Sequence, residues 1–257
     1  MLIEAGVPAF RTPESCADVI GALLRWRAPL AGIAPRPYPA AAGTVMDERD
    51  SLALLDGLGV PVIPAVEVPI DDAGRTALPF GWPVVAKVLS DAVPHKTEAG
   101  GVVVGIDGPE ALAAAAARIA ASVAAHHPGV TVERLLVKPM AVGLQEVLLG
   151  YRRDPQVGPV VTLAPGGVLV GLYDDKAVRL APVDEATAAE MIAEVMGLAP
   201  LRGHRGLPKG DLAALVRAVA AFSRLAEAAE VLEADANPVM VTGDGVVAVD
   251  ALILKGG

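Results

Sequence analysis

The feature of the sequence that most constrains the fold is a lysine inside a run of valines. Residues 83–89 are apolar and valine-rich, and Gly81 and Trp82 precede them, which predicts a buried strand. Lys87 interrupts this run, although lysine is seldom buried without a partner. Gly100-Gly101 then open a second apolar run. A strand lysine beside the free N–H groups of a glycine-rich return suits an anion such as phosphate. An ordinary hairpin with a solvated lysine explains the same residues equally well.

The loop between these two runs carries His95 and Lys96, directly after Pro94. A neutral imidazole nitrogen is nucleophilic near neutral pH and can carry a phosphoryl group for a short time. A histidine that only hydrogen-bonds within its loop fits the pattern as well, and spacing alone leaves both interpretations open.

A second polar constellation lies near the end of the chain, at Glu233, Asp235 and Asn237. Strand side chains alternate between faces, so these three should point the same way. Oxygen-bearing side chains on one face suit a hard cation such as Mg²⁺, which takes one or two carboxylates and completes its shell with water and phosphate oxygens. A solvated polar strand face is the alternative.

Composition narrows the class of protein. Hydrophobic residues make up 53% of the chain and charged residues 20%, which predicts a folded protein with a sizeable core. The net charge of −9 argues against a nucleic acid partner, but it leaves room for a nucleotide held by a few lysines and arginines. No apolar stretch is suited to cross a membrane, and the first ten residues lack the basic start of a signal peptide. A cytoplasmic protein is expected.

Helix and strand patterns are mixed along the chain, which predicts an α+β fold. Thr12 begins a helix that runs to about residue 26, and a proline-rich linker follows at 28–44. This leader cannot bury a core alone, so we expect it to dock on a partner or to belong to another domain. Further helices are predicted at 47–58, 109–126, 184–196 and 208–228. Further strands are predicted at 130–138, 144–151, 157–163, 168–173, 177–181, 230–235, 239–242 and 246–252. The four between residues 144 and 181 are predicted to form an antiparallel meander.

Residues 47–254 closely resemble the ATP-grasp (β) part of the NDP-forming acyl-CoA synthetases, which include ADP-forming acetate–CoA ligases and are related to succinyl-CoA synthetase. The stretches that carry the resemblance are GWPVVAKVLSDAVPHKTEAGGVVVGI, GYRRDPQVGPVVTLAPGG, AVRLAPV, PLRGHRG and EADANPVMV. The resemblance implies an ATP-grasp fold, with the nucleotide between two α+β lobes at 47–136 and 137–257. Residues 1–46 would be a leader and linker that resembles the tail of an upstream succinyl-CoA-ligase-like domain.

The resemblance also implies roles for single residues. Lys87 matches the lysine that holds the nucleotide phosphates, and His95, with Lys96, matches the loop that relays phosphate. Asp235 and Asn237 match a Mg²⁺-binding pair, to which the strand pattern adds Glu233. Further nucleotide contacts are implied for a hinge near adenine, a glycine loop and an arginine near the phosphates: Val137, Lys138, Met140, Gly166, Gly167 and Arg179. The implied cofactors are ATP or ADP and Mg²⁺.

The implied reaction converts a carboxylic acid, CoA and ATP into acyl-CoA, ADP and phosphate through a phosphohistidine. A CoA-binding α-type subunit or domain would supply CoA and the small carboxylic acid, so we expect a hetero- or homo-oligomer and no complete reaction by this chain alone.

The chain departs from the family pattern at three places. Ala164-Pro165 replaces Gly-Leu, Gly171 replaces a common glutamate, and Lys138-Pro139 replaces Gln-Glu. These changes leave open a catalytically degenerate partner or regulatory subunit. An ATP-grasp ligase that forms an acyl phosphate directly, without a histidine, is the other alternative.

Overall fold

The computed structural model describes residues 9–10, 12–26, 43–90, 93, 96, 98–167 and 175–256. The chain divides into two compact units, residues 1–34 and 35–257. The first unit contains helix α1 (Pro13–Arg25), and the Thr12 hydroxyl accepts a hydrogen bond from the Ser15 N–H at 3.2 Å. The helix start predicted at Thr12 is therefore confirmed.

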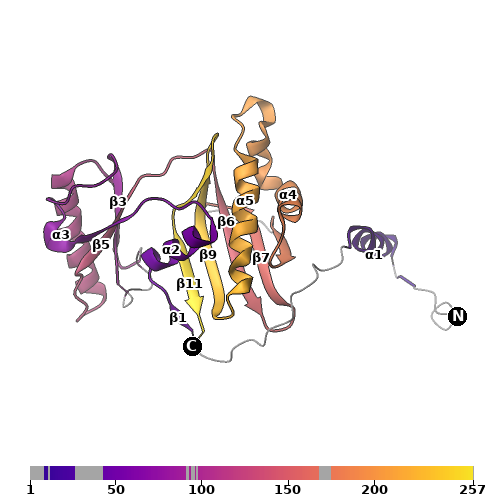
Figure 1. The fold of residues 1–257 in the computed structure, drawn as a ribbon, viewed down its shortest axis with the longest axis horizontal. Helices are drawn as coiled ribbons and strands as arrows, with labels where there is room; N and C mark the ends of the chain where they lie inside the picture. Colours follow the sequence, from indigo (N-terminus) through magenta and orange to yellow (C-terminus); the bar gives the residue numbers. More distant parts are fainter. Residues whose placement is uncertain are drawn as a thin grey trace. The chain divides into compact units, whose positions relative to one another are not determined.

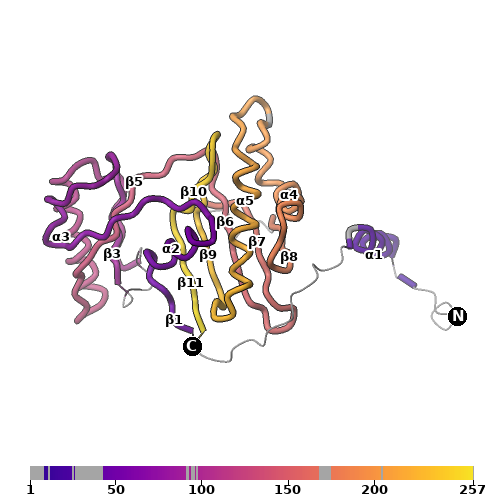
Figure 2. Tube along the Cα trace, viewed as in Figure 1, coloured from indigo at the N-terminus to yellow at the C-terminus, as the bar shows by residue number. Residues whose placement is uncertain are grey.

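The second unit combines helices with two antiparallel sheets, which confirms the α+β fold class (Figures 1 and 2). Its strands are β1 (Thr44–Val45), β2 (Val66–Pro69), β3 (Val84–Val88), β4 (Val102–Ile106), β5 (Arg134–Pro139), β6 (Gln145–Asp154), β7 (Gly158–Pro165), β8 (Ala177–Leu180), β9 (Val231–Val241), β10 (Val246–Ala248) and β11 (Ala251–Lys255). Its α-helices are α2 (Glu48–Leu58), α3 (Pro109–His126), α4 (Glu185–Glu194) and α5 (Leu212–Ser223), and its 3-10 helices are η1 (Ile70–Asp72), η2 (Met196–Arg202), η3 (His204–Gly206) and η4 (Arg224–Glu227).

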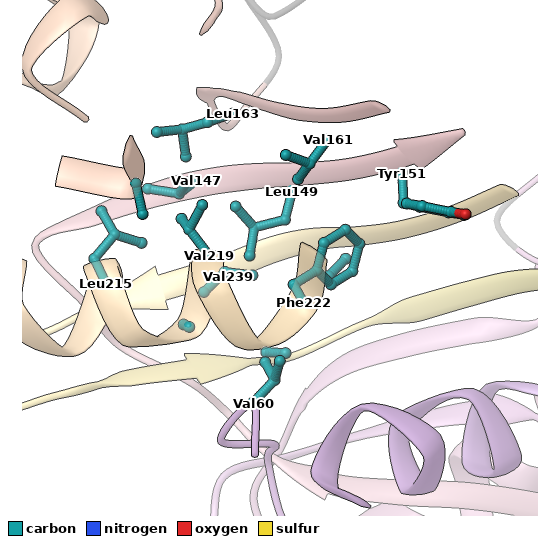
Figure 3. Close-up of a cluster of buried hydrophobic side chains, with 14 of the residues drawn as sticks. Val60, Val147, Leu149, Tyr151, Val161, Leu163, Leu215, Val219, Phe222 and Val239 are labelled. Atoms are coloured by element: carbon teal, nitrogen blue, oxygen red, sulfur yellow. The ribbon is translucent and has the colours of Figure 1, made fainter. Parts of the chain in front are cut away.

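The larger sheet, as far as its residues are described, has the strand order β1-β11-β9-β6-β7-β8, with β10 paired to β9. Helices α4 and α5 pack on one of its faces (Figure 1). Figure 3 shows the core between α5 and the larger sheet, where Val219 and Phe222 of α5 lie near Val147 and Leu149 of β6. Along β9, the polar residues alternate with buried ones. The polar residues therefore lie on the face of the larger sheet opposite to α4 and α5.

The smaller sheet has the order β2-β5-β3-β4, and α3 packs against β3 and β4. A separate hydrophobic core lies between them and includes Val84, Val88, Leu112 and Ile119. Lys87 therefore stands on a strand whose other face is buried under α3, which directs its side chain away from that core.

Helix α2 does not join the smaller sheet, although the sequence analysis places it in the first lobe. Leu52 and Leu55 belong to the core of the larger sheet, and α2 contacts β11 and α5. The partners of the apolar face of α2 include β11, which lies about 200 residues later in the chain, so the local sequence pattern does not reveal this packing. The predicted lobe boundary at 136–137 also falls inside β5, and the division into lobes stays a prediction.

The last strands differ from the predicted pattern in two ways. β9 continues through Asn237-Pro238 as one strand, whereas the sequence analysis predicts two. The predicted strand at 246–252 is instead divided into β10 and β11, with Val249 and Asp250 between them. β6, β7 and β8 form the predicted antiparallel meander, while the strand predicted at 168–173 lies outside the described residues.

Candidate functional site

A cavity of about 430 Å³ is lined by residues from both sheets and from the start of α2. Its charged and polar lining includes Glu48, Lys87, Lys96, Asp235, Asn237 and Asp250. The structure thus brings together the lysine of the early strand and two oxygen-bearing residues of the late strand, as the resemblance implies.

Lys87 reaches the cavity from β3 and forms two ion pairs. Its ammonium lies 3.1 Å from Glu48 Oε1, and it also donates to Asp250 Oδ2. Burial alone would lower the pKa of Lys87, but the carboxylates of Asp250 and Glu48 raise it above its ordinary value. Lys87 is therefore held as a cation with two anionic partners, facing a cavity.

Glu48 lies in the first turn of α2 and is almost fully buried. Lys96 Nζ lies 3.4 Å from Glu48 Oε2, and Lys138 Nζ donates to Glu48 Oε1. Burial would raise the pKa of Glu48, but the ammonium groups of Lys138, Lys87 and Lys96 hold it at about 2. Glu48 is thus ionised and shared by lysines from separate segments of the chain.

The break between β10 and β11 contributes two further groups. Lys138 Nζ donates to the Val249 carbonyl oxygen at 2.7 Å, and the Asp250 carboxylate accepts from Lys87. The Asp250 carbonyl also accepts from the Asn237 N–H at 3.2 Å. The interruption of the strand therefore supplies both a carboxylate and a carbonyl to lysines of the smaller sheet.

The residues predicted to bind Mg²⁺ separate in the structure. Asp235 and Asn237 line the cavity, whereas Glu233 lies further along β9 and pairs with Arg152 at 3.5 Å. Within the described part of the chain, no three His, Cys, Asp or Glu side chains cluster closely enough to hold a metal by themselves. Asp235, Asn237 and Asp250 nevertheless offer two carboxylates and an amide oxygen in one cavity, which suits a Mg²⁺ that keeps water and phosphate oxygens.

Asp235 should make the stability of the metal-free protein depend on pH. Burial and the neighbouring charge of Asp250 raise its pKa from 3.8 to about 6. Between these values the folded protein binds more protons than the unfolded chain, so stability falls as the pH rises through this window. We expect a loss of about 1–2 kcal/mol between pH 5 and pH 7.5 that the Asp235→Asn variant does not share. Chemical denaturation of both proteins at the two pH values measures this; equal pH dependence would contradict it.

The predicted glycine loop follows β7, where the chain turns past β6. The Gly166 N–H donates to the Glu146 carbonyl oxygen at 2.7 Å, and Gly167 has φ +92°, a conformation that favours glycine. A Cβ at Gly166 would lie 2.7 Å from Glu146 Cβ and 2.9 Å from Val147 N. Close approach to β6 therefore requires a glycine at position 166.

Replacing Gly166 by alanine should destabilise the protein by about 1–3 kcal/mol, because the added methyl group has no space beside β6. Gly81→Ala is the matched control, since a Cβ at Gly81 would meet nothing within 4 Å. Thermal unfolding of both variants gives the comparison. Equal stability of the two would show that the end of β7 adjusts freely.

The other predicted nucleotide residues lie in diverse surroundings. Val137 is buried within β5, and Met140 is partly exposed beyond it, where its N–H donates to the Pro83 carbonyl at 2.9 Å. Arg179 on β8 pairs with Glu194 at 2.5 Å and does not line the cavity. His95 and Gly171 lie outside the described residues.

Among the lining residues that the sequence analysis does not single out are Glu48 and Asp250, the two carboxylates that pair with Lys87. Asp250 interrupts an apolar run in the same way that Lys87 interrupts residues 83–89. A charged residue inside an apolar run is therefore the sequence signal that could have identified Asp250 as a candidate site residue. Glu48 offers no such signal, because an acidic residue in the first turn of a helix is common and favours the helix dipole.

Comparison with known proteins places this architecture in one family. The family model described as an ATP-grasp domain matches residues 38–254, and the chain belongs to this family. The resemblance seen in the sequence and the ATP-grasp fold are therefore confirmed. Among the described residues, no helix combines the length and the apolar character that crossing a membrane requires.

Two curated relatives have different lengths. The chain is 36% identical over 209 residues to acetate–CoA ligase [ADP-forming] I of Archaeoglobus fulgidus, and the match covers 80% of this chain but 30% of that ligase. It is 33% identical over 224 residues to the β subunit of acetate–CoA ligase [ADP-forming] II of Pyrococcus furiosus, covering 84% of this chain and 94% of that subunit. The chain thus spans less than a third of the first relative and nearly all of the second.

Solved structures of acetyl-coenzyme A synthetase 1 from Ca. Korarchaeum cryptofilum share this fold. One, described as a complex with coenzyme A and Ca-AMPCP, has a TM-score of 0.77 and 30% identity, covering 94% of this chain and 99% of that chain. Another, with coenzyme A and Mg-AMPPCP, has a TM-score of 0.72 and 31% identity, covering 82% and 93%. The description of the second states that its phosphohistidine segment points towards the nucleotide-binding site.

Proposed function

We propose that this chain is the ATP-binding, phosphoryl-transferring part of an ADP-forming acyl-CoA synthetase. The observation that carries the proposal is the meeting of Lys87, Asp235 and Asn237 in one cavity. Phosphoryl transfer depends mainly on positive charge at the phosphates and on a metal between their oxygens. The site combines a buried cation with oxygen ligands, and the Korarchaeum protein binds a magnesium nucleotide on the same fold.

In this proposal, Lys87 and Lys96 bind the phosphates, while Asp235 and Asn237, with Asp250, hold Mg²⁺. Gly166 and Gly167 would complete the phosphate loop, and Val137 and Met140 would form the hinge beside adenine. Arg179, which pairs with Glu194 outside the cavity, would have to turn towards the phosphates when the nucleotide binds. Mg²⁺ would neutralise charge on the transferred phosphoryl group. His95 would receive that group: an imidazole nitrogen bonds to the γ-phosphorus as the bond between this phosphorus and the ADP oxygen breaks.

A CoA-binding α-type subunit or domain would complete the reaction. It would supply CoA and a small carboxylic acid, and accept the phosphoryl group from His95. The proposal is supported by the match to the Pyrococcus furiosus protein, which is named as the β subunit of an ADP-forming acetate–CoA ligase. Acyl-CoA formation by the purified chain without a partner would contradict this part of the proposal.

Calorimetric titration of ATP and ADP, with and without Mg²⁺, tests the nucleotide site. We expect Mg²⁺-dependent binding that the Asp235→Ala variant loses. Asp71→Ala is the matched control, because Asp71 is an exposed acid in η1 that does not line the cavity. Absence of binding by the wild-type chain, both alone and with a candidate α-type subunit, would favour the catalytically degenerate alternative.

Labelling with ATP that carries a radioactive γ-phosphate tests the histidine relay. We expect a base-stable, acid-labile label on the protein that His95→Ala abolishes, since phosphohistidine forms at that residue. A ligase that forms an acyl phosphate directly would turn over with His95→Ala unchanged, and this result would favour the other alternative.

A further inference from the structure

Glu48 is the meeting point of the buried charges beside the cavity. The residue is 5% exposed, and among the described residues its carboxylate contacts the ammonium groups of Lys87, Lys96 and Lys138. It belongs to α2, which packs on the larger sheet, whereas Lys87 and Lys138 stand on neighbouring strands of the smaller sheet. A single carboxylate therefore joins side chains that the sequence places far apart.

Lys138 is the most deeply buried of these lysines, with a side chain that is 1% exposed. It donates to Glu48 Oε1 and, at 2.7 Å, to the Val249 carbonyl oxygen. It does not line the cavity. Two acceptors and a rigid strand thus fix the Lys138 ammonium, and this fixed ammonium in turn holds Glu48 Oε1 in place.

Lys87 and Lys96 have a different position, because both line the cavity. Their side chains are 13% and 21% exposed, and they contact the two oxygens of Glu48, Lys87 at Oε1 (3.1 Å) and Lys96 at Oε2 (3.4 Å). Like charges repel, and lysine side chains are flexible, so an anion shared by both cations favours their staying side by side at the cavity. Asp250 also holds Lys87, but among the described residues Glu48 is the carboxylate that contacts both lysines.

We propose that Glu48, anchored by Lys138, is a positioning residue that aligns Lys87 and Lys96 with the phosphates of the bound nucleotide. The inference rests on the proposed function and assigns a role to two residues that need not touch the nucleotide through their side chains. Preorganised cations bind phosphate more tightly than mobile ones, because less side-chain freedom is lost on binding.

A merely structural role for Glu48 is the competing explanation. In that case the carboxylate offsets the charge of Lys138 and has no effect on nucleotide recognition once the fold is intact. The two explanations predict different changes in nucleotide affinity as the number of phosphates in the nucleotide increases. A positioning role affects the gain in affinity from AMP to ADP to ATP, whereas a structural role affects all three nucleotides equally or not at all.

The test uses the full chain with Glu48→Gln and Lys138→Met combined. This double variant removes both members of the buried pair, so no fully buried charge loses its partner: Lys87 keeps Asp250, and Lys96, whose side chain is 21% exposed, remains hydrated. The fold should therefore persist. With Mg²⁺ present, calorimetry measures the affinity for AMP, ADP and ATP. We expect AMP affinity close to that of the wild type, and a gain from AMP to ATP that is about tenfold smaller. A cooperatively folded double variant with the wild-type gain would overturn the proposal.

Two further variants keep the test decisive. Lys138→Met alone retains Glu48 but removes its anchor, and it should also reduce the gain from AMP to ATP; an unchanged gain contradicts the anchoring role even where the double variant is unstable. Glu67→Gln is the matched control, because Glu67 pairs with Arg49 at 2.6 Å and Arg134 at 2.9 Å but does not line the cavity. A wild-type chain that shows no gain from AMP to ATP would instead overturn the proposed function itself, and this inference with it.

Discussion

Replacing Glu48 by glutamine is expected to lower the free energy of unfolding by about 3–5 kcal/mol. The change leaves the Lys138 ammonium, 1% exposed, without a carboxylate partner, and an uncompensated buried charge is one of the most costly defects in a protein interior. Burial already lowers the pKa of Lys138, and loss of Glu48 removes the main charge that opposes this effect. Urea denaturation of the wild type and the variant at neutral pH gives the difference directly.

Two comparisons show whether the buried pair causes this loss. Adding Lys138→Met to Glu48→Gln should recover most of the stability, because a buried ion pair replaced by apolar or neutral groups is often tolerated. Glu67→Gln should cost about 1 kcal/mol or less, because its arginine partners are half exposed and remain hydrated. Equal losses for Glu48→Gln and Glu67→Gln would mean that the Glu48 cluster contributes no more than a surface ion pair.

Replacing Lys87 by methionine is expected to reduce the affinity for MgATP by about 10- to 100-fold. A hydrogen bond to a charged group contributes about 1.5–3 kcal/mol, and each 1.4 kcal/mol corresponds to a factor of ten. Methionine preserves the unbranched apolar stem of lysine, so strand β3 should keep its packing. Calorimetric titration of MgATP into the variant measures the change, and thermal unfolding shows whether the fold is intact.

Lys255→Met is the matched control for this result. Lys255 ends β11, a strand of the larger sheet, and does not line the cavity. The two variants change the net charge of the chain equally, so a general electrostatic effect would weaken MgATP binding in both. Unchanged affinity in a folded Lys87→Met variant would remove Lys87 from the nucleotide site.

Much of the local structure was determined by the sequence itself. The structure confirms the helix start predicted at Thr12 and the helix predicted at 47–58. The Thr12 and Asp47 side chains accept backbone hydrogen bonds within one turn, and the Gly59 N–H donates to carbonyls of the last turn. Lys87 interrupts an apolar strand pattern, and Asp235 belongs to a set of polar residues that alternate along one strand. Signals of this kind act over a few neighbouring residues, so they are visible without knowledge of the fold.

Only the tertiary structure decided how the charges at the site are compensated. Glu48 lies 39 residues before Lys87 and 90 before Lys138, and Asp250 lies 163 residues after Lys87. The placement of α2 on the larger sheet and the break between β10 and β11 bring Glu48 and Asp250 to the lysines of the smaller sheet. Coulombic interaction depends on separation in space and on burial, and neither quantity is written in the local pattern of residues.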